Sequence, residues 1–199
     1  QLCLDWETEA VKAEEYGVRV CTLRLGIVLG REGGVLKQVM PSFEMGIGTY
    51  VGSPKQMVPW IHILDAVRAV EFCIDTKING PINVVAPKAS TSINFAKLLA
   101  NISRAKIVLH IPYIILLLVF ASGAKVLTNS QNAVPNKLIG NNFKFEYDSL
   151  EKALKDEVAP EFIQISKSSR VISHLKSKGQ YQLKTSIILN SKAEDTFAF

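Results

Sequence analysis

Residues 46–75, GIGTYVGSPKQMVPWIHILDAVRAVEFCID, decide the fold, because this one stretch runs from a glycine-rich loop through a short apolar segment into an amphipathic helix. The glycines within residues 46–52 tolerate backbone angles that other residues resist, which predicts a tight turn. Residues 57–63 are dense in apolar and aromatic side chains and predict a short buried strand. Asp65 then falls in the first turn of the predicted helix, where exposed amides and the helix dipole favour a carboxylate.

The predicted helix after residue 63 has a broad apolar face. Its expected core residues are Val67, Val70, Phe72 and Ile74 with the smaller Ala66, Ala69 and Cys73, while Arg68, Glu71 and Asp75 are expected in water. Two interpretations stay open for His62 and Asp65. They are either a hydrogen-bonding pair that fixes the start of the helix, which is the commoner use of such residues, or part of a functional site.

Composition limits the class of protein. A chain of 199 residues with 48% hydrophobic content can form one ordinary domain and part of a second. The formal charge of +5 is spread along the chain, which argues against nucleic-acid binding. The three cysteines are widely spaced, as in reduced thiols of a cytoplasmic protein. The histidines lack nearby ligand residues, so we expect no metal site.

The apolar run at residues 107–121 is the one membrane candidate. His110 and Pro112 interrupt it, and it is shorter than the roughly 20 residues that cross a bilayer, so we expect a buried or groove-lining segment and no membrane insertion. The chain opens on Gln1, inside a predicted helix and without a signal peptide, which indicates an N-terminally truncated fragment.

The order of the elements predicts an α/β protein. A helix over residues 4–16, ended by Gly17, and a strand over residues 18–25 make half of a βαβ unit, which implies a parallel sheet. Residues 26–34 follow as a loop at the carboxyl end of that strand, where open α/β sheets bind ligands. The other predicted elements are a helix at 34–46 interrupted near Pro41, a strand at 81–87, a helix at 90–103 with a serine or threonine cap, and short helices at 136–140 and 149–154 around a strand at 143–147.

Four stretches occur in unbroken order: LCLDWETEA at 2–10, RVCTLRLGIVLGREGGVLKQVMPSFEMGIGTYVGSPKQMVPWIHILD at 19–65, GPINVVAP at 80–87 and SQNAVPNKLIGNNFKFEYDSLEKAL at 130–154. This series resembles the epimerase-family proteins of the NAD-dependent epimerase/dehydratase superfamily, which are extended short-chain dehydrogenases/reductases. The resemblance implies the carboxyl-terminal part of a Rossmann-type fold with a small α+β substrate-side lobe. It also implies NAD or NADP as cofactor, bound mainly by the missing N-terminal half, and a small-molecule substrate that is nucleotide-sugar-like or another carbonyl or hydroxyl compound.

The same resemblance divides the chain. Residues 1–87 are expected to belong to the Rossmann-like domain and residues 88–155 to the substrate-side domain. Residues 156–180 are rich in serine and lysine and predict a linker. Residues 181–199 resemble the first strand and helix of a truncated START-like ligand-binding domain.

Candidate ligand contacts lie in the two glycine-containing loops. The predicted cofactor-binding residues are Arg24, Gly26, Gly30, Gly33 and Gly34, and the predicted substrate-binding residues are Gln56, Trp60 and His62. Turn formation alone is the alternative for the glycines. For Arg24 the alternative is a structural ion pair with Asp5 or Glu9.

The expected catalytic pair is missing. In the superfamily a Tyr-x-x-x-Lys pair precedes the strand that carries the "LR" word, but the corresponding positions hold Leu2 and Trp6, neither of which can transfer a proton. The catalytic residues are therefore unknown. Related nucleotide-sugar enzymes place an arginine shortly before the position of His62 to hold a diphosphate, but residues 57–59 here read Met-Val-Pro. Lys55 or Arg31 could replace it as a point charge, and the alternative for each is a solvated loop cation. Two functions stay open: an enzyme of the epimerase/dehydratase class, or a catalytically inactive NAD(P)-binding regulatory or binding protein.

Overall fold

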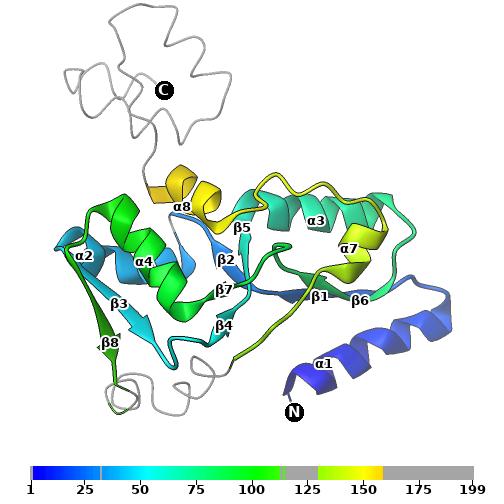
Figure 1. Cartoon of the computed structure of the whole chain (residues 1–199). Helices are drawn as coiled ribbons and strands as arrows, with labels where there is room; N and C mark the ends of the chain where they lie inside the picture. Colours follow the sequence, from blue (N-terminus) through cyan, green and yellow to red (C-terminus); the bar gives the residue numbers. More distant parts are fainter. Residues whose placement is uncertain (1, 32, 113, 115–129, 159–199) are drawn as a thin grey trace, which may run out of the picture. The chain divides into compact units, whose positions relative to one another are not determined.

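The computed structural model describes residues 2–31, 33–112, 114 and 130–158, all within a unit formed by residues 1–159 (Figure 1). The predicted linker and START-like segment lie outside the described residues, as does most of the predicted apolar run after Ile111. The predicted division at residue 87 stays a prediction. Among the described residues, none of the helices combines the length and apolarity needed to span a bilayer.

Two parallel strands joined by a crossover helix confirm the predicted α/β class. Strand β1 (Cys21–Leu25) pairs with β6 (Gly80–Val84) in parallel, with Cys21 opposite Gly80. Helix α3 (Ile63–Asp75) directly precedes β6 and ends the long crossover, residues 26–79, that returns the chain to a strand parallel to β1. Figure 1 shows α3 on one side of this pair and α1 (Leu2–Val11) on the other.

Gly26 marks the point where the chain changes partner. Its amide donates to Val84 O at 3.1 Å, whereas the next amide, of Ile27, donates to Pro59 O at 2.8 Å. Strand β2 (Ile27–Leu29) then pairs in parallel with β5 (Trp60–His62), so the predicted loop over residues 26–34 is wrong over these three residues. A Cβ on Gly26 would lie 2.9 Å from both Pro59 O and Val85 Cγ1, which leaves room for glycine only.

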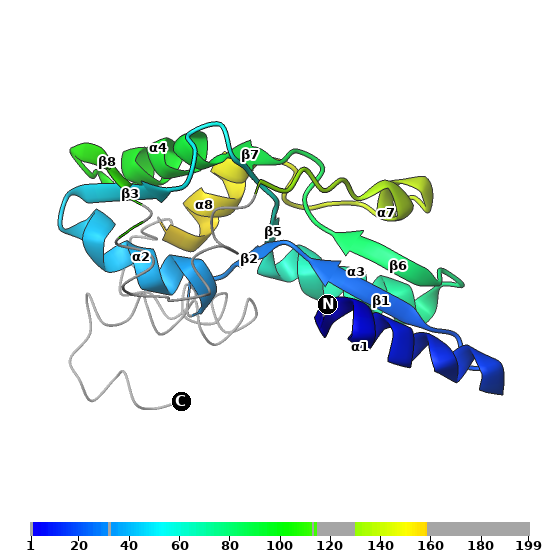
Figure 2. The ribbon, with the colours of Figure 1, turned by 90° about the horizontal axis from the view of Figure 1, so that it is seen from below.

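The remaining elements surround these strands. Strand β3 (Ile47–Val51) pairs in parallel with β8 (Ile107–Ile111), and β4 (Met57–Val58) pairs in antiparallel orientation with β7 (Ser90–Thr91). The other helices are η1 (Lys12–Tyr16, a 3₁₀ helix), α2 (Gly34–Glu44), α4 (Ser92–Ser103), α7 (Asn136–Gly140) and α8 (Leu150–Val158). Figure 2 shows α2, α4, α8, β3 and β8 grouped together, apart from the β1–β6 pair with α3.

Two hydrophobic clusters meet at β5. Trp60 belongs to a cluster that includes Leu36 and Leu99, while its neighbour Ile61 belongs to one that includes Ile82. Successive strand residues point to opposite faces, so this one short strand contributes to both clusters. The apolar density of residues 57–63 therefore reflects burial on two sides.

Several local predictions are confirmed. The first helix ends at Gly17, whose φ of 73° is left-handed, although its last turn is the 3₁₀ helix η1. The Thr91 side chain accepts from the Asn94 amide and caps α4 as expected. Gly46 and Gly52 have positive φ, as the predicted tight turns require.

Other local predictions are wrong for identifiable reasons. Pro59 divides the predicted strand at 57–63, because proline has no N–H for a ladder. Helix α2 continues through Pro41, since Leu36 and Phe43 on either side of it are buried and hold the helix on the core. Strand β3 occupies the predicted glycine-rich loop. Ile107 and Leu109 of β8 are about half exposed, unlike the expected buried segment.

The predicted core face of α3 is also corrected. Val67, Val70 and Ile74 are 48%, 40% and 68% exposed. The prediction is confirmed for the small Ala66, Ala69 and Cys73, which are buried in the cluster that includes residues of β6, and for Phe72, which packs against it. The predicted face was too broad, because the buried side of the helix carries mainly small side chains.

Candidate functional site

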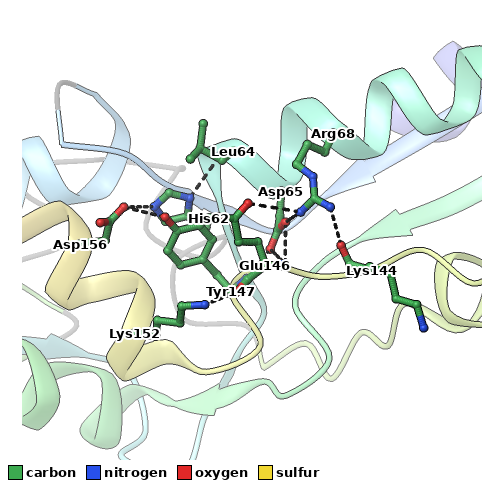
Figure 3. A network of polar contacts seen from close by, with 9 residues as sticks. All are labelled: His62, Leu64, Asp65, Arg68, Lys144, Glu146, Tyr147, Lys152 and Asp156. Carbon is green, nitrogen blue, oxygen red and sulfur yellow. Dashed lines mark hydrogen bonds and ion pairs between the residues drawn. The ribbon is translucent and has the colours of Figure 1, made fainter. Parts of the chain in front are cut away.

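A buried polar network joins the start of α3 to the carboxyl-terminal segment at residues 144–157 (Figure 3). The Asp65 carboxylate is fully buried and accepts hydrogen bonds from the backbone amides of Glu146, at 3.0 Å, and Tyr147, at 2.8 Å. Arg68 Nη1 donates to the same carboxylate at 2.6 Å, and its Nη2 donates to Lys144 O at 2.9 Å. The amides of Glu146 and Tyr147 thus donate to a side chain instead of a neighbouring strand, which explains why the strand predicted at 143–147 does not form.

His62 fixes the start of α3. The ring is 1% exposed, and its Nδ1 accepts a hydrogen bond from the Leu64 amide at 3.2 Å. The first interpretation of this residue, a hydrogen bond at helix entry, is therefore what the structure shows. Asp65 does not cap the helix but holds a segment more than 80 positions further along the chain. The His62 ring also stacks on Tyr147, with centroids 3.6 Å apart.

Two carboxylates at the end of α8 complete the network. Glu157 Oε1 lies 2.9 Å from His62 Nε2, and Asp156 Oδ2 lies 3.6 Å from the same nitrogen. The Nε2 hydrogen is not aligned with either oxygen, so the contact is electrostatic rather than a linear hydrogen bond. Glu157 Oε2 accepts from the Arg31 amide at 2.6 Å, which connects α8 to the loop between β2 and α2.

Tyr147 donates its hydroxyl hydrogen to Asp156 Oδ2 at 2.7 Å. Burial raises the pKa of Tyr147 far above its ordinary value of 10, and the Asp156 carboxylate raises it further. The hydroxyl therefore stays a hydrogen-bond donor across the physiological range. It is a link between helix α8 and the segment before it, not a proton source.

His62, Asp156 and Glu157 also have the chemistry of a metal site, because one ligand atom from each lies within 4.8 Å of the others. The tautomer argues against this use. A backbone N–H can only donate, so Nδ1 carries the lone pair and the neutral ring has its hydrogen on Nε2. A metal ion would need the Nε2 lone pair, and binding it would break the helix cap. These residues do not fit a metal site while α3 keeps this start.

Arg24 has a protein partner at the candidate cofactor edge. Its Nε and Nη2 donate to the two carboxylate oxygens of Glu7 at 2.7 and 2.6 Å, and this hydrogen bonding lowers the pKa of Glu7. The sequence pointed to Asp5 or Glu9 as the structural partner, and Glu7 corrects that prediction. The pair lies at the surface, so a ligand anion can compete with Glu7 for the guanidinium.

The candidate glycines differ in what surrounds them. Gly26 is required by packing against Pro59 and Val85, and Gly30 makes ordinary contact with Ile63. Gly33 has no atom near its missing Cβ, and Gly34 has φ of 59° at the first residue of α2. Turn formation therefore accounts for part of this loop. A cofactor contact at these residues stays a prediction, and the open space at Gly33 and the left-handed backbone of Gly34 suit it best.

The candidate substrate residues are all buried: Gln56, Trp60 and His62 are 8%, 0% and 1% exposed. Trp60 Nε1 donates to Lys88 O at 2.9 Å, which occupies its polar atom. Their contact with substrate stays a prediction. A cavity of about 190 Å³ adjoins the other side of Glu157 and is lined by Arg31, Leu36, Lys37, Met40, Pro41, Glu44, Glu157 and Val158.

Known proteins resemble this chain in sequence and in fold. A family model described as "Domain of unknown function (DUF1731)" matches residues 111–157, the range that includes Glu146, Tyr147 and the α8 carboxylates. An epimerase family protein of Mycobacterium bovis is 33% identical over 156 residues, which are 77% of this chain and 52% of that protein. One from Staphylococcus aureus is 34% identical over 152 residues, 76% of this chain and 51% of its own length.

Solved structures agree. The human epimerase family protein SDR39U1, solved with NADPH, superimposes with a TM-score of 0.68 and 28% identity over 71% of this chain and 48% of its own. UDP-glucose 4-epimerase from Thermotoga maritima, solved with UDP-glucose, shows the same fold with a TM-score of 0.60 and 22% identity over 76% of this chain and 49% of its own.

The parallel strand pair, its crossover helix and these neighbours define a Rossmann-type protein of the extended short-chain dehydrogenase/reductase class. Within that class, the chain is similar to the epimerase family proteins over about three quarters of its length. It spans about half the length of the curated relatives it matches.

Proposed function

We propose that the protein binds NAD or NADP and acts as an epimerase/dehydratase-like protein on a nucleotide-sugar-like or other small carbonyl or hydroxyl compound. The observation that carries the proposal is the β1–β6 pair with its crossover helix α3, in a chain 28% identical to a protein solved with NADPH. Rossmann-type sheets bind dinucleotides outside the carboxyl ends of their parallel strands. In this chain those ends lie at Leu25 and Val84, next to the candidate residues Arg24 and Gly26.

The described residues would contribute to one side of such a site. A bound nicotinamide cofactor supplies hydride transfer. The Arg24 guanidinium can hold a phosphate or carboxylate if it leaves Glu7, and the amides near Gly33 and Gly34 can approach a polar ligand closely. A substrate contact of His62 stays a prediction, and the network around Asp65 and Glu157 does not touch a ligand in this proposal. It holds the carboxyl-terminal segment and the loop at Arg31 in place.

A second function is favoured by one sequence feature, the substitution of the acid/base pair. Leu2 and Trp6 stand where the superfamily has tyrosine and lysine, and both are well exposed on α1. A hydrocarbon and an indole cannot exchange a proton with substrate at neutral pH. The alternative is therefore an NAD(P)-binding regulatory or binding protein that does not turn over.

Cofactor titration of the full-length protein tests the first part of the proposal. We expect saturable binding of NADPH or NADH, followed by nicotinamide fluorescence, and weaker binding in Gly34→Val, whose side chain would occupy a left-handed position beside Val28 O. Gly140→Ala is the matched control, because no atom lies near its missing Cβ. The absence of binding of either cofactor at about 1 mM would overturn the proposal.

Turnover separates the two functions. Sustained conversion of sugar nucleotides or small carbonyl compounds to epimerised, dehydrated or reduced products, abolished in Gly34→Val, would exclude the inactive alternative. Tight cofactor binding without turnover over such a panel would favour it.

A further inference from the structure

Two cysteines that are distant in sequence lie together at the far end of the β1–β6 pair from the candidate cofactor edge. Cys21 is the first residue of β1 and is partly buried, and Cys73 lies in the last turn of α3 and is buried. Both belong to the hydrophobic cluster that α3 forms with the sheet. Cys3, on α1, is exposed.

One guanidinium group connects the two residues. Arg19 Nη1 lies 3.3 Å from Cys21 Sγ and 2.7 Å from Cys73 O, and it also donates to Ile78 O at 2.7 Å. The Cys21 thiol itself donates to Ile78 O at 3.1 Å. Because one nitrogen contacts both residues, the Cys21 sulfur is held beside the last turn of α3.

The Cys21 thiol also affects the protonation of Cys73. Burial raises the pKa of the Cys73 thiol, the neighbouring Cys21 thiol raises it further, and the Arg19 charge opposes both effects. Cys73 therefore holds its proton more firmly than a free cysteine does. Cys21 is the more accessible of the two and stands next to a cation.

We propose that Cys21 and Cys73 form a dithiol that exchanges with small-molecule disulfides and closes a reversible disulfide between β1 and α3. This proposal does not rest on the proposed function, because it concerns the opposite end of the strand pair and needs no dinucleotide. The oxidant is a disulfide of the glutathione class, RSSR, which many cells contain.

The exchange proceeds in two steps that balance. Cys21 loses its proton to solvent, its thiolate attacks one sulfur of RSSR, and RS⁻ leaves and takes up a proton to give the first RSH. Cys73 then transfers its proton to solvent and attacks the Cys21 sulfur, and the second RSH leaves. Two cysteines are oxidised to one disulfide, and one RSSR is reduced to two RSH. The product joins the last turn of α3 to the first residue of β1 and so closes the loop between residues 21 and 73.

The test uses the full chain with Cys3→Ser, so that only the two proposed thiols remain. The folded protein is incubated with glutathione disulfide, quenched with acid, alkylated in denaturant and analysed by mass spectrometry before and after trypsin. We expect a product that has lost two hydrogens, carries no alkyl label and yields a peptide pair linked through Cys21 and Cys73. Dithiothreitol should return both thiols.

Variants define the order of events. Cys73→Ala should stop at a glutathione adduct on Cys21, whereas Cys21→Ala should react far more slowly, because its remaining thiol is buried. If either variant is poorly folded, the linked peptide from the Cys3→Ser protein still decides the question. The proposal is overturned if the Cys3→Ser protein keeps two free thiols or stops at a glutathione adduct. Either result would mean that the Cα atoms of Cys21 and Cys73 do not come within the roughly 7 Å that a disulfide requires.

Discussion

At the scale of single residues, Asp65 is the group whose loss should cost most. Asp65→Asn keeps the size of the side chain but faces the amides of Glu146 and Tyr147 with an NH₂ group and leaves Arg68 without its closest carboxylate. Removing one partner of a buried ion pair costs about 3–5 kcal/mol, so urea should unfold the variant at a much lower concentration. Asp75→Asn, an exposed acid at the end of the same helix, should change stability by less than about 0.5 kcal/mol. Equal stability of the two variants would contradict the assigned role.

Tyr147 gives a prediction in pH. Its pKa is raised in the folded protein, so the neutral hydroxyl is the form that folding favours. This contribution is complete below the unfolded-state pKa of about 10 and is lost as the pH rises above it. At neutral pH, Tyr147→Phe should be less stable than the wild-type protein by about 1 kcal/mol, because it lacks the hydrogen bond from the Tyr147 hydroxyl to Asp156. When the pH rises from about 8 to about 11, the variant should lose less unfolding free energy than the wild-type protein.

The control for this pH effect is Tyr16→Phe, at an exposed tyrosine in η1. Its alkaline profile should match the wild type. An equally steep alkaline decline in Tyr147→Phe would show that other groups control stability in this range.

His62 and Asp65 also show what the sequence could and could not predict. The helix-entry contact of His62 spans two positions, and such a local hydrogen bond follows from the residue type and its place before a helix. The partners of Asp65 lie 81 and 82 positions away, and no periodic pattern connects them. Glu157 was missed for the same reason.

At the scale of elements, Gly26 separates a packing role from a ligand role. Gly26→Ala places a Cβ 2.9 Å from Pro59 O and Val85 Cγ1, at the point where β1 leaves β6 and β2 joins β5. Overpacking of this kind costs about 1–3 kcal/mol, measured by chemical unfolding, with Gly140→Ala as the control. If Gly26→Ala keeps full stability and loses only cofactor binding, the residue contacts the ligand and is not required by packing.

The elements were more predictable than their pairing. Helices α1, α3, α4 and α8 were expected within a few residues, because their caps and apolar spacing are local. The order of helix, turn and strand predicted a parallel sheet, although the partner strands were expected upstream and β6 lies downstream of β1. The division of the strand at Pro59 and the change of partner at Gly26 were not predicted either, since both depend on which segments meet in space.

At the scale of the whole molecule, the described helices should differ sharply in amide exchange. Helix α3 has four buried residues and packs on β1 and β6, whereas α1 has none, and its Leu4 and Trp6 are more than 60% exposed. Local opening costs little where few apolar contacts are lost. In the 199-residue chain, hydrogen–deuterium exchange followed by mass spectrometry should therefore show rapid labelling of α1 and slow labelling of α3.

The contrary outcome would be informative about α1. Protection of α1 equal to that of α3 would mean that Leu4 and Trp6 are covered in solution, by a second copy of the chain or by contacts that the described residues do not make. Dilution distinguishes these cases. Protection through a second copy falls with protein concentration, because association follows mass action, whereas protection within one chain does not change.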